Sequence, residues 1–398
     1  MEHKIMTEAR SMEETIRSDR RWLHAHAETG FDLVNTKEYV KNRLTEMGYT
    51  PTPCGRSGLS VTVGSGEKTL LLRADMDALP IREESGEAFA CPDGTMHACG
   101  HDLHTAMLLG AAQLLKNHET ELQCTVKLMF QPAEEIFEGS KDMIDAGVLE
   151  DPKPDGALMI HVTAGTPLPA GTIVVSAPGV SAPAADYFTI HVQGRGCHGS
   201  APQDGIDALT AAAHILIALQ EISARELAAS DEVVVTIGTM RAGTAGNVIA
   251  DSAEMEGTIR CYEEDIRTRL KDRITRIAQG VGSAFRTEVS VTYGSGCPPL
   301  KNDKTLSQWV YATLRESLGS GKVLSTGDFG SGKPARGGGS EDFAYISQQV
   351  PSLMLALAAG EPDKGFPYPQ HHPKVRFDES VLPVGAAVFT IAALAYGS

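Results

Sequence analysis

Apolar side chains follow two different periods along the chain, and their alternation predicts a mixed α/β fold. Residues 8–27 and 102–116 have the pattern of helices, whereas the Val- and Leu-rich runs 69–74 and 125–130 are typical of buried strands. Strands that alternate with helices in this way favour a sheet with many parallel strands, covered by helices. The other elements expected in this part are strands at 59–63 and 157–160, a helix at 140–146, and a helix that a capping box at 35–38 opens and Gly48 ends.

The middle of the chain has another order of elements. We expect strands at 187–192, 233–240, 254–260 and 288–293, and helices at 206–222 and 263–285. This order, β-α-β-β-α-β, is that of the ferredoxin-like arrangement. The α/β pattern then returns with a helix at 306–318, a strand at 353–358 and a last helix after Asp378. We therefore predict one α/β domain, residues 1–184 and 297–398, interrupted by an inserted module, residues 185–296.

Composition narrows the function. The 398 residues suffice for two or three domains, and the formal charge of −16 argues against general nucleic-acid binding. No apolar run approaches the length of a membrane span, and the N-terminus lacks the apolar core of a secretory signal. Seven scattered cysteines without a CxxC pair fit a reducing compartment. We therefore expect a cytoplasmic protein without membrane or nucleic-acid partners.

The densest group of reactive side chains lies between Met96 and His104, where three histidines, a cysteine and an aspartate occur in nine residues. Cys99 and His101 come just before a predicted helix, whose N-terminal dipole favours a thiolate. A thiolate and an imidazole two residues apart suit a borderline-soft divalent ion such as zinc. Whether His97 and His104 are ligands or structural residues stays open.

An acidic pair, Glu134 and Glu135, follows the strand 125–130, at the end of a strand where α/β sheets place their ligands. Adjacent side chains diverge, so we expect one carboxylate to bind metal and the other to handle protons.

Further candidates lie at other strand ends and in a late loop. His161 follows the strand 157–160, and the pair His371-His372 precedes the last helix. Asp75 and Asp77 end another strand and could orient imidazoles or hold positive groups. Ligands of Cys, His, Glu, His and His type are too many for one tetrahedral site, and they suit two metal ions that share a water molecule.

Two glycine-rich segments are not expected to form a ligand site. Residues 327–333 resemble the start of a phosphate-binding loop, but Pro334 stands where a metal-binding hydroxyl is required, so we reject a nucleotide site. Residues 64–66 are expected to form a hairpin turn between two short strands. The chain has no GxSxG motif, which argues against a serine hydrolase.

The order of the motifs resembles the di-metal amidohydrolase family of hippurate hydrolase and the plant indoleacetyl-amino acid hydrolases, which are relatives of aminoacylases and carboxypeptidases. The resemblance covers almost the whole chain. The motifs that carry it are Arg73–Pro80, Met96–Asp102, Gln131–Glu135, His198–Pro202, Asn247–Ile249, Gly257–Arg260, Gly339–Ala344 and His371–Pro373.

The resemblance implies a role for individual residues. The two metal ions would be held by Cys99, His101, Glu135, His161 and His371, the last because the family's final ligand stands two residues before a proline. Glu134 would be the general base. In the inserted module, His198 would reach the reacting carbonyl, while Asn247 and Arg260 would hold the carboxylate end of the substrate. The inserted module would be a ferredoxin-like lid that mediates dimerisation.

The implied activity is hydrolysis of the amide bond of an N-acyl amino acid or short peptide. The implied cofactors are two divalent ions, zinc or manganese, with cobalt or nickel as further candidates. A protein of the same fold that binds without catalysis is the alternative, and the presence of Glu134 beside a complete ligand set argues against it.

Overall fold

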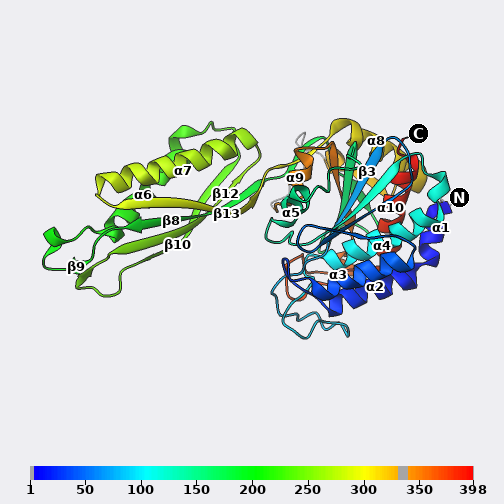
Figure 1. Cartoon of the computed structure of the whole chain (residues 1–398), viewed down its shortest axis with the longest axis horizontal. Coiled ribbons are helices and arrows are strands. Elements are labelled where there is room, and N and C mark those ends of the chain that lie inside the picture. Colours follow the sequence, from blue (N-terminus) through cyan, green and yellow to red (C-terminus); the bar gives the residue numbers. More distant parts are fainter. Residues whose placement is uncertain (1–3, 330–338, 398) are drawn as a thin grey trace. The chain divides into compact units, whose positions relative to one another are not determined.

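The computed structural model describes residues 4–329 and 339–397, and the chain divides into two compact units. The larger unit contains the described residues up to Ser181, those from Lys301 to Phe329, and those from Glu341 onwards, whereas the smaller unit includes Ala182–Leu300. Figure 1 shows helices packed around the sheet of the larger unit and two helices along one face of the sheet of the smaller unit.

The larger unit is a mixed α/β layer structure around an eight-stranded sheet of order β1-β2-β4-β3-β5-β16-β6-β15. Its central strands β4, β3, β5 and β16 run parallel, and every residue of β3 is buried, as expected for a strand covered on both faces. The strands are β1 Thr52–Cys54, β2 Gly58–Val63, β3 Thr69–Asp75, β4 Thr125–Gln131, β5 Gly156–Thr163, β6 Ile173–Val175, β15 Val323–Ser325 and β16 Ser352–Ala358.

Helix α4 is the central helix of this unit, and it packs against α2, α10 and β3. Fourteen of its seventeen residues are buried, so it joins the sheet to the outer helices. Among the described residues, no helix is both long and apolar enough to cross a lipid bilayer. The helices are α1 Lys4–Ser11, α2 Glu13–Ala25, α3 Val34–Glu46, α4 His101–Asn117, α5 Gly139–Asp145, α8 Lys304–Leu318, α9 Ala344–Ser347 and α10 Leu382–Ala395.

Two local predictions for the N-terminal part are wrong. The helix expected at 8–27 is two helices, α1 and α2, which separate at Met12. The expected capping box does not form, because α3 already begins at Val34 and its side-chain cap comes from elsewhere. The carboxylate of Glu28 accepts hydrogen bonds from the backbone N–H groups of Asn35 and Thr36, at 3.0 and 2.9 Å.

One of the two glycine-rich segments also differs from its sequence-based interpretation. Residues 64–66 do not form a hairpin turn, because β4 lies between β2 and β3 in the sheet. The other segment, 327–333, begins within a 3-10 turn formed by Thr326–Phe329. The remainder of the segment lies outside the described residues.

The smaller unit has its own apolar core between a four-stranded antiparallel sheet and two helices. The order of its strands is β10-β12-β8-β13, and its elements follow one another as β8, α6, β10, β12, α7 and β13. Short strands β9 and β11 form a separate pair, as do β7 and β14. The elements of the smaller unit are β8 Ala184–Gln193, β9 Cys197–His198, α6 Ala208–Glu221, β10 Val233–Ala242, β11 Val248–Ile249, β12 Ser252–Cys261, α7 Glu264–Ala284 and β13 Glu288–Cys297. Strands β7 Gly179–Ala182 and β14 Leu300–Asn302 belong mostly to the larger unit.

Candidate metal centre and active site

The carboxyl ends of neighbouring parallel strands meet at one place in the larger unit, where α/β sheets bind their ligands. The register of β3 and β4 pairs Asp75 with Gln131, and on β5 it pairs His161 with Ala356 of β16. The sequence analysis placed His161 after its strand, but β5 continues to Thr163. His161 therefore projects from a hydrogen-bonded strand, which fixes its backbone.

The segment before α4 brings a thiol and an imidazole to the same place. Gly100, at the N-cap of α4, has a φ of +96°, and a Cβ atom there would lie 2.4 Å from Cγ2 of Val162. Only glycine allows both the left-handed backbone and this close approach. The turn at Gly100 places the Sγ atom of Cys99 3.5 Å from Nε2 of His161, and His101 is the first residue of the helix.

Asp77 orients the acidic pair and one of the imidazoles. Its carboxylate accepts hydrogen bonds from the backbone N–H groups of Glu134 and Glu135, at 3.0 and 3.1 Å. Its backbone oxygen lies 2.8 Å from Nδ1 of His101, which must donate to it. The Nε2 atom of His101 is therefore the nitrogen with a free lone pair, and it lies 3.9 Å from a carboxylate oxygen of each glutamate.

The late loop supplies one more imidazole. The Nε2 atom of His371 lies 3.6 Å from Oε1 of Glu135, and its backbone N–H donates to the oxygen of Ala98 at 2.9 Å. The neighbouring His372 instead stacks on Tyr368, with ring centroids 4.2 Å apart. The structure thus brings His371, rather than His372, to the acidic pair.

These side chains form overlapping groups whose donor atoms lie within 4.8 Å of one another. The thiol of Cys99 belongs to two groups, so the structure joins them at this atom. All five residues predicted as ligands, together with Glu134, are brought together. Three of the five groups contain the predicted ligands: Cys99, His101 and His161; Cys99, Glu135 and His371; and His101, Glu134 and Glu135. The other two are Asp75, His101 and His104, and Glu134, Glu341 and Asp342.

The donor atoms fit divalent cations. The Nε2 atom of His101 and the Oε1 atom of Glu135 are buried, and neither has a hydrogen-bond partner in the described part of the chain. Burying a polar atom without a partner costs about 1–3 kcal/mol. A bound ligand would remove this cost for both the Nε2 atom of His101 and the Oε1 atom of Glu135. A thiol and imidazole nitrogens suit a borderline divalent ion, and the carboxylates are ligands that harder divalent ions also accept.

Without a cation, the environment disfavours the anions that a metal requires. Burial raises the pKa of Cys99 to about 12, so a bound cation is needed to hold this side chain as the thiolate. Burial also raises the pKa of Glu135 to about 7. Burial together with the nearby carboxylates of Glu341 and Glu135 raises the pKa of Glu134 well above its ordinary value. Bound cations would reverse these shifts.

The two remaining histidines of the motif are not among the ligand groups formed by Cys99. His104 donates from Nδ1 to Asp75 at 2.6 Å and accepts at Nε2 from the backbone N–H of Val162 at 2.9 Å, so both ring nitrogens are used. His97 is fully buried, its ring nitrogens have no partner among the described residues, and burial lowers its pKa to about 3.

Sequence analysis missed a buried ionic network that surrounds the acidic pair. The guanidinium of Arg73, 1% exposed, donates to Asp75, Glu341 and Asp342 at 2.6–3.0 Å. The carboxylates of Glu341 and Asp342 lie within 4.8 Å of Glu134. One buried cation thus stands among several carboxylates, which again favours additional positive charge at the site. These residues belong to quoted motifs, but their spacing gave no hint of the network.

The pattern of peptidase family M20/M25/M40 matches residues 71–395, which include every residue of the metal centre. The chain belongs to this family. It is a metal-dependent amidohydrolase of the M20 group.

Named relatives span nearly the whole M20 chain. N-acetylcysteine deacetylase of Bacillus subtilis is 34% identical over 93% of this chain and 93% of its own. IAA-amino acid hydrolase ILR1-like 4 of Arabidopsis thaliana is 35% identical over 95% of this chain and 84% of its own. Among solved structures, the YXEP protein of Bacillus subtilis, described as a dinuclear metal binding peptidase, has a TM-score of 0.77 at 30% identity and covers 97% of this chain and 98% of its own.

In the smaller unit of this M20 enzyme, the predicted His198 and Asn247 lie together. The strands β9 and β11 pair His198 with Val248, and the N–H of Gly199 donates to the oxygen of Asn247 at 2.7 Å. The Nδ1 atom of His198 accepts the backbone N–H of Ser200 at 3.1 Å. The proton of the neutral ring is therefore on Nε2, and the side chain is exposed.

Arg260 lies elsewhere in the same unit. It is the ninth residue of β12, so it stands about 26 Å along the strand from Ser252, where β12 begins beside the β9–β11 pair. Its guanidinium lies 5.5 Å from the ring centroid of Tyr187. The structure therefore does not bring Arg260 to Asn247 within one copy of the unit.

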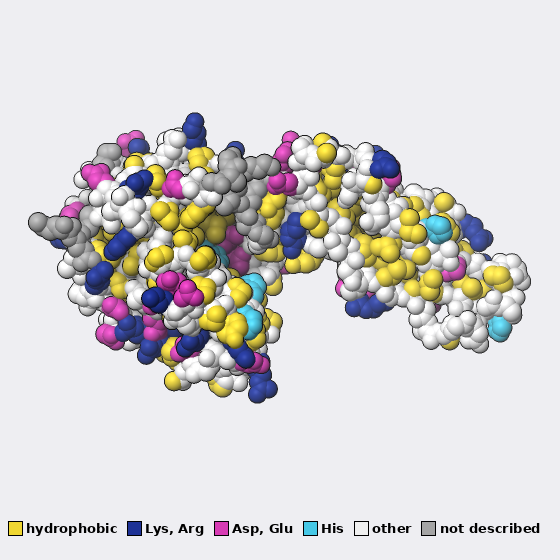
Figure 2. Space-filling model, turned by 180° about the vertical axis from the view of Figure 1, so that it is seen from behind, with side chains coloured by type: hydrophobic (Ala, Val, Ile, Leu, Met, Phe, Trp, Pro, Cys, Tyr) yellow, Lys and Arg dark blue, Asp and Glu magenta, His cyan; other side chains and the backbone are white. Residues whose placement is uncertain are grey.

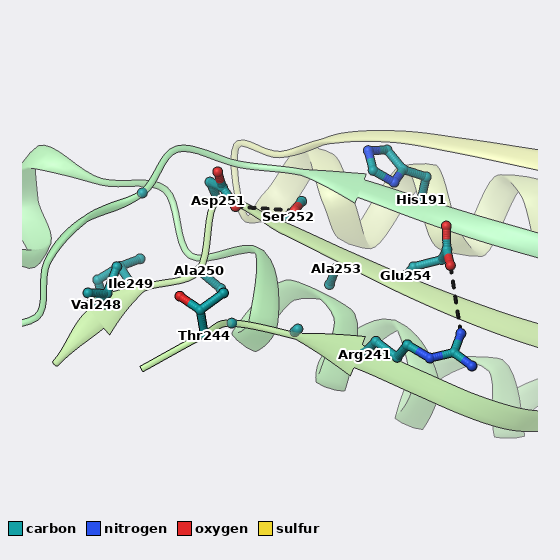
Figure 3. Close-up of a pocket in the computed structure, with 13 residues that line it drawn as sticks. His191, Arg241, Thr244, Val248, Ile249, Ala250, Asp251, Ser252, Ala253 and Glu254 are labelled. Atoms are coloured by element: carbon teal, nitrogen blue, oxygen red, sulfur yellow. Dashed lines mark hydrogen bonds and ion pairs between the residues drawn. The ribbon is translucent and has the colours of Figure 1, made fainter. Parts of the chain in front are cut away.

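A pocket of about 460 Å³ lies beside β11 in the smaller unit. Figure 3 shows Val248 and Ile249 at one end of this pocket and His191, Arg241 and Glu254 at the other. Arg241 is 3.8 Å from the carboxylate of Glu254, so its charge is compensated within the pocket. The pocket therefore adds no uncompensated cation to the region of His198 and Asn247.

Proposed function

We propose that this M20 enzyme hydrolyses the amide bond of N-acyl amino acids, with two divalent ions held by Cys99, His101, Glu135, His161 and His371. The observation that carries the proposal is the pair of overlapping ligand groups that share the thiol of Cys99, beside a buried glutamate that is not needed as a ligand. The names of the relatives support an acyl amino acid as the substrate class, because one is a deacetylase and another an amino acid conjugate hydrolase.

The residues divide the chemistry between them. The bound cations would polarise the scissile carbonyl and make water more acidic. The carboxylate of Glu134 lies 5% exposed at the edge of the ligand groups, where it can accept a proton from the attacking water and pass it to the leaving nitrogen. The exposed Nε2–H of His198 would donate to the oxygen on which negative charge develops.

The test of this role is Glu134→Gln. We expect the rate of amide hydrolysis to fall by about 10²–10⁴, since the amide cannot take up a proton. Bound metal, measured by elemental analysis, should stay unchanged. Glu138→Gln is the matched control, because this nearby glutamate pairs with Arg56 on the surface and is expected to leave the rate as it is. A Glu134→Gln variant that loses both metals would show that Glu134 is a ligand rather than the base.

We further propose that the smaller unit, predicted as residues 185–296, is a ferredoxin-like lid through which two chains dimerise. Its strand order β10-β12-β8-β13 and its β-α-β-β-α-β sequence support this assignment. β10 is an edge strand, and the unpaired backbone groups of an edge strand can pair with another chain. Figure 2 shows hydrophobic side chains along the surface of this unit, and the most exposed include Ile217 at 67% and Val234 at 52%.

A dimer would also explain the separation of Asn247 and Arg260. If both hold the carboxylate end of one substrate, they cannot come from the same unit, because they stand at opposite ends of its sheet. We therefore propose that each active site combines the Arg260 of one chain with the His198 and Asn247 of another. The scattered cysteines of the sequence, none of them in a CxxC pair, support the expected cytoplasmic location.

Subunit mixing tests this arrangement. Glu134→Gln and His198→Ala chains, each inactive alone, should regain about a quarter of wild-type activity when they are unfolded and refolded together, because mixed dimers have one complete site. Persistent inactivity of the mixture, with a dimeric mass by light scattering, would show that His198 serves its own chain.

A panel of N-acetyl, N-benzoyl and indoleacetyl amino acids, assayed with manganese, zinc or cobalt, would identify the acyl group. Failure to hydrolyse any of them would contradict the proposed substrate class.

A further inference from the structure

His24, on α2, is a buried histidine outside the Cys99-centred ligand groups, and its ring joins two carboxylates from separate segments. Its Nδ1 atom lies 2.8 Å from Asp102, and its Nε2 atom 3.0 Å from Glu83. The side chains of all three are at most 3% exposed. Since ionised carboxylates only accept hydrogen bonds, both ring nitrogens donate, and the ring is an imidazolium. Burial favours the neutral ring, yet the two carboxylates raise the pKa of His24 above its ordinary value.

Each of these carboxylates is close in the chain to a different metal ligand. Asp102 directly follows His101 at the start of α4. Glu83 precedes Glu84, whose backbone N–H donates to the oxygen of Pro373 at 2.8 Å, and Pro373 is two residues after His371. His24 therefore connects the segment of His101 with the loop of His371.

The segment between β3 and α4, residues 76–100, needs such anchors because it forms neither a helix nor a strand. Paired backbone hydrogen bonds between Leu79 and Met96 close its base. Between Leu79 and Met96 in the chain, the ring of Phe89 packs edge-on against His24, at 5.2 Å between centroids, and the carboxylate of Glu83 accepts a hydrogen bond from the same imidazole. Side-chain contacts with α2 thus replace the hydrogen bonds of regular structure.

The two sides of this contact differ in strength. Asp102 has a second buried partner, because Nε of Arg20 lies 2.7 Å from the same carboxylate oxygen. His101 is also held independently through the backbone oxygen of Asp77. Glu83 has no second cation among its described contacts; its other bond is to Ser85, two residues away. Loss of His24 should therefore release the Glu83 side first.

We propose that His24 is a positioning residue that holds the loop of the ligand His371 at the correct distance from the helix start that carries the ligand His101. The inference rests on the dinuclear site of the proposed function. Without the imidazolium, Glu83 would be a buried carboxylate without a counter-ion, and it would move towards water. The backbone bond from Glu84 to Pro373 would then loosen, and the loop of His371 would be held near Glu135 by its remaining contacts, such as the bond from the N–H of His371 to Ala98.

The experiment is a titration of the metal-free, full-length protein with manganese or zinc alone, followed by calorimetry. Wild type should bind two ions. In His24→Ala and Glu83→Gln, the affinity for one of the two ions should fall by about 10–100-fold, as is typical when a partner of a ligand is lost, while the other ion binds nearly as before. Combining both substitutions should add little to His24→Ala alone, because they break one contact.

His26→Ala is the matched control. This histidine lies just after α2, is exposed, and stacks on Trp22 at 4.0 Å between centroids, away from the two carboxylates. It should bind both ions with wild-type affinity. Glu83→Gln keeps the shape and volume of the side chain, so it answers the question even if His24→Ala fails to fold.

Wild-type affinity for both ions in Glu83→Gln would overturn the proposal. So would equal weakening of both ions together with a lower melting temperature of the metal-free protein, because this would be a general structural defect. A wild-type chain that binds two ions but hydrolyses no N-acyl amino acid would contradict the proposed substrate while leaving the role of His24 intact. A wild-type chain that binds fewer than two ions would overturn both.

Discussion

The metal centre of the larger unit and the His198 region of the smaller unit hold their functional side chains in opposite ways. In the metal centre, His101 is completely buried, and Asp77 fixes both its ring and the backbone of the acidic pair. In the smaller unit, His198 is exposed on a strand pair of two residues on each side, and the contacts of its ring are with Ser200.

If the proposed function is correct, this difference is a division of labour between the two regions. Two cations tolerate little error in ligand distance, so their site is built from strands, a helix start and buried hydrogen bonds that cannot rearrange separately. A side chain that contacts the substrate only after binding can stand on an exposed segment, here the β9–β11 strand pair that carries His198, which we call the arm. Such a side chain needs a second protein surface to enclose it. A change in the backbone of the metal centre should therefore abolish metal binding and activity together, whereas substitutions in the arm should lower activity by different amounts with the metal still bound.

The largest effect is expected from Gly100→Ala. An alanine at a φ of +96° costs about 1–2 kcal/mol, and its Cβ atom would lie 2.4 Å from Val162, which adds about 1–3 kcal/mol. The turn must then move the ligands on both sides, Cys99 and His101. We expect loss of bound metal and, because the reaction depends on the metal, loss of measurable activity. Elemental analysis and a hydrolysis assay measure both.

Gly94→Ala separates backbone strain from the close approach. Gly94 has a similar φ of +83°, but a Cβ atom there would meet nothing within 4 Å. Its substitution should lower the melting temperature slightly and leave the metal content at two ions. If Gly94→Ala loses metal as readily as Gly100→Ala, the contact with Val162 is not what makes this turn critical.

The sequence predicted much of this centre because its ligands follow strands and open a helix, and such positions are visible as changes in the period of apolar residues. The sequence did not predict that His161 stands inside β5. The expected strand ended at the first polar side chain, but in a strand buried on both faces the change from apolar to polar residues does not mark the end of the strand. The helix start at Val34 was missed for a related reason. Its cap is Glu28, which acts through the fold rather than through local spacing.

A smaller effect is expected from His198→Ala on the arm. Loss of one donor to the developing oxyanion should lower kcat by about 10²–10³, with both metal ions still bound. His191→Ala is the matched control, because this histidine lies on β8 of the same unit and is exposed. Loss of metal from His198→Ala would contradict the division between the two regions, and full activity would remove His198 from the reaction.

The arm was harder to predict than the metal centre. Strands β9 and β11 have two residues each, too few for any periodic pattern, and they form only because the backbone of Gly199 meets that of Asn247. The strand that carries Arg260 was predicted, but its distance from His198 depends on the register of β12 against β8. The sequence motifs thus identified the candidate residues, whereas the distance between His198 and Arg260 could be known only from the register of the sheet.

The smallest effect is expected from Ser200→Ala, which sharpens the account of how the arm prepares His198. The Nδ1 atom of His198 has two neighbours in Ser200, the hydroxyl at 2.7 Å and the backbone N–H at 3.1 Å. Alanine removes the hydroxyl but keeps the N–H, so the proton stays on Nε2 and the ring keeps its tautomer. A lost hydrogen bond of about 0.5–1.5 kcal/mol corresponds to roughly a two- to tenfold lower kcat, with KM and metal content unchanged.

In a His198→Ala background the same substitution should have no further effect, because the hydroxyl acts only through the ring. An additional loss there would show that Ser200 contacts the substrate itself. A Ser200→Ala enzyme as impaired as His198→Ala would show that the hydroxyl, rather than the backbone, sets the tautomer, and the arm would then be as sensitive to a single polar contact as the buried centre is to Gly100.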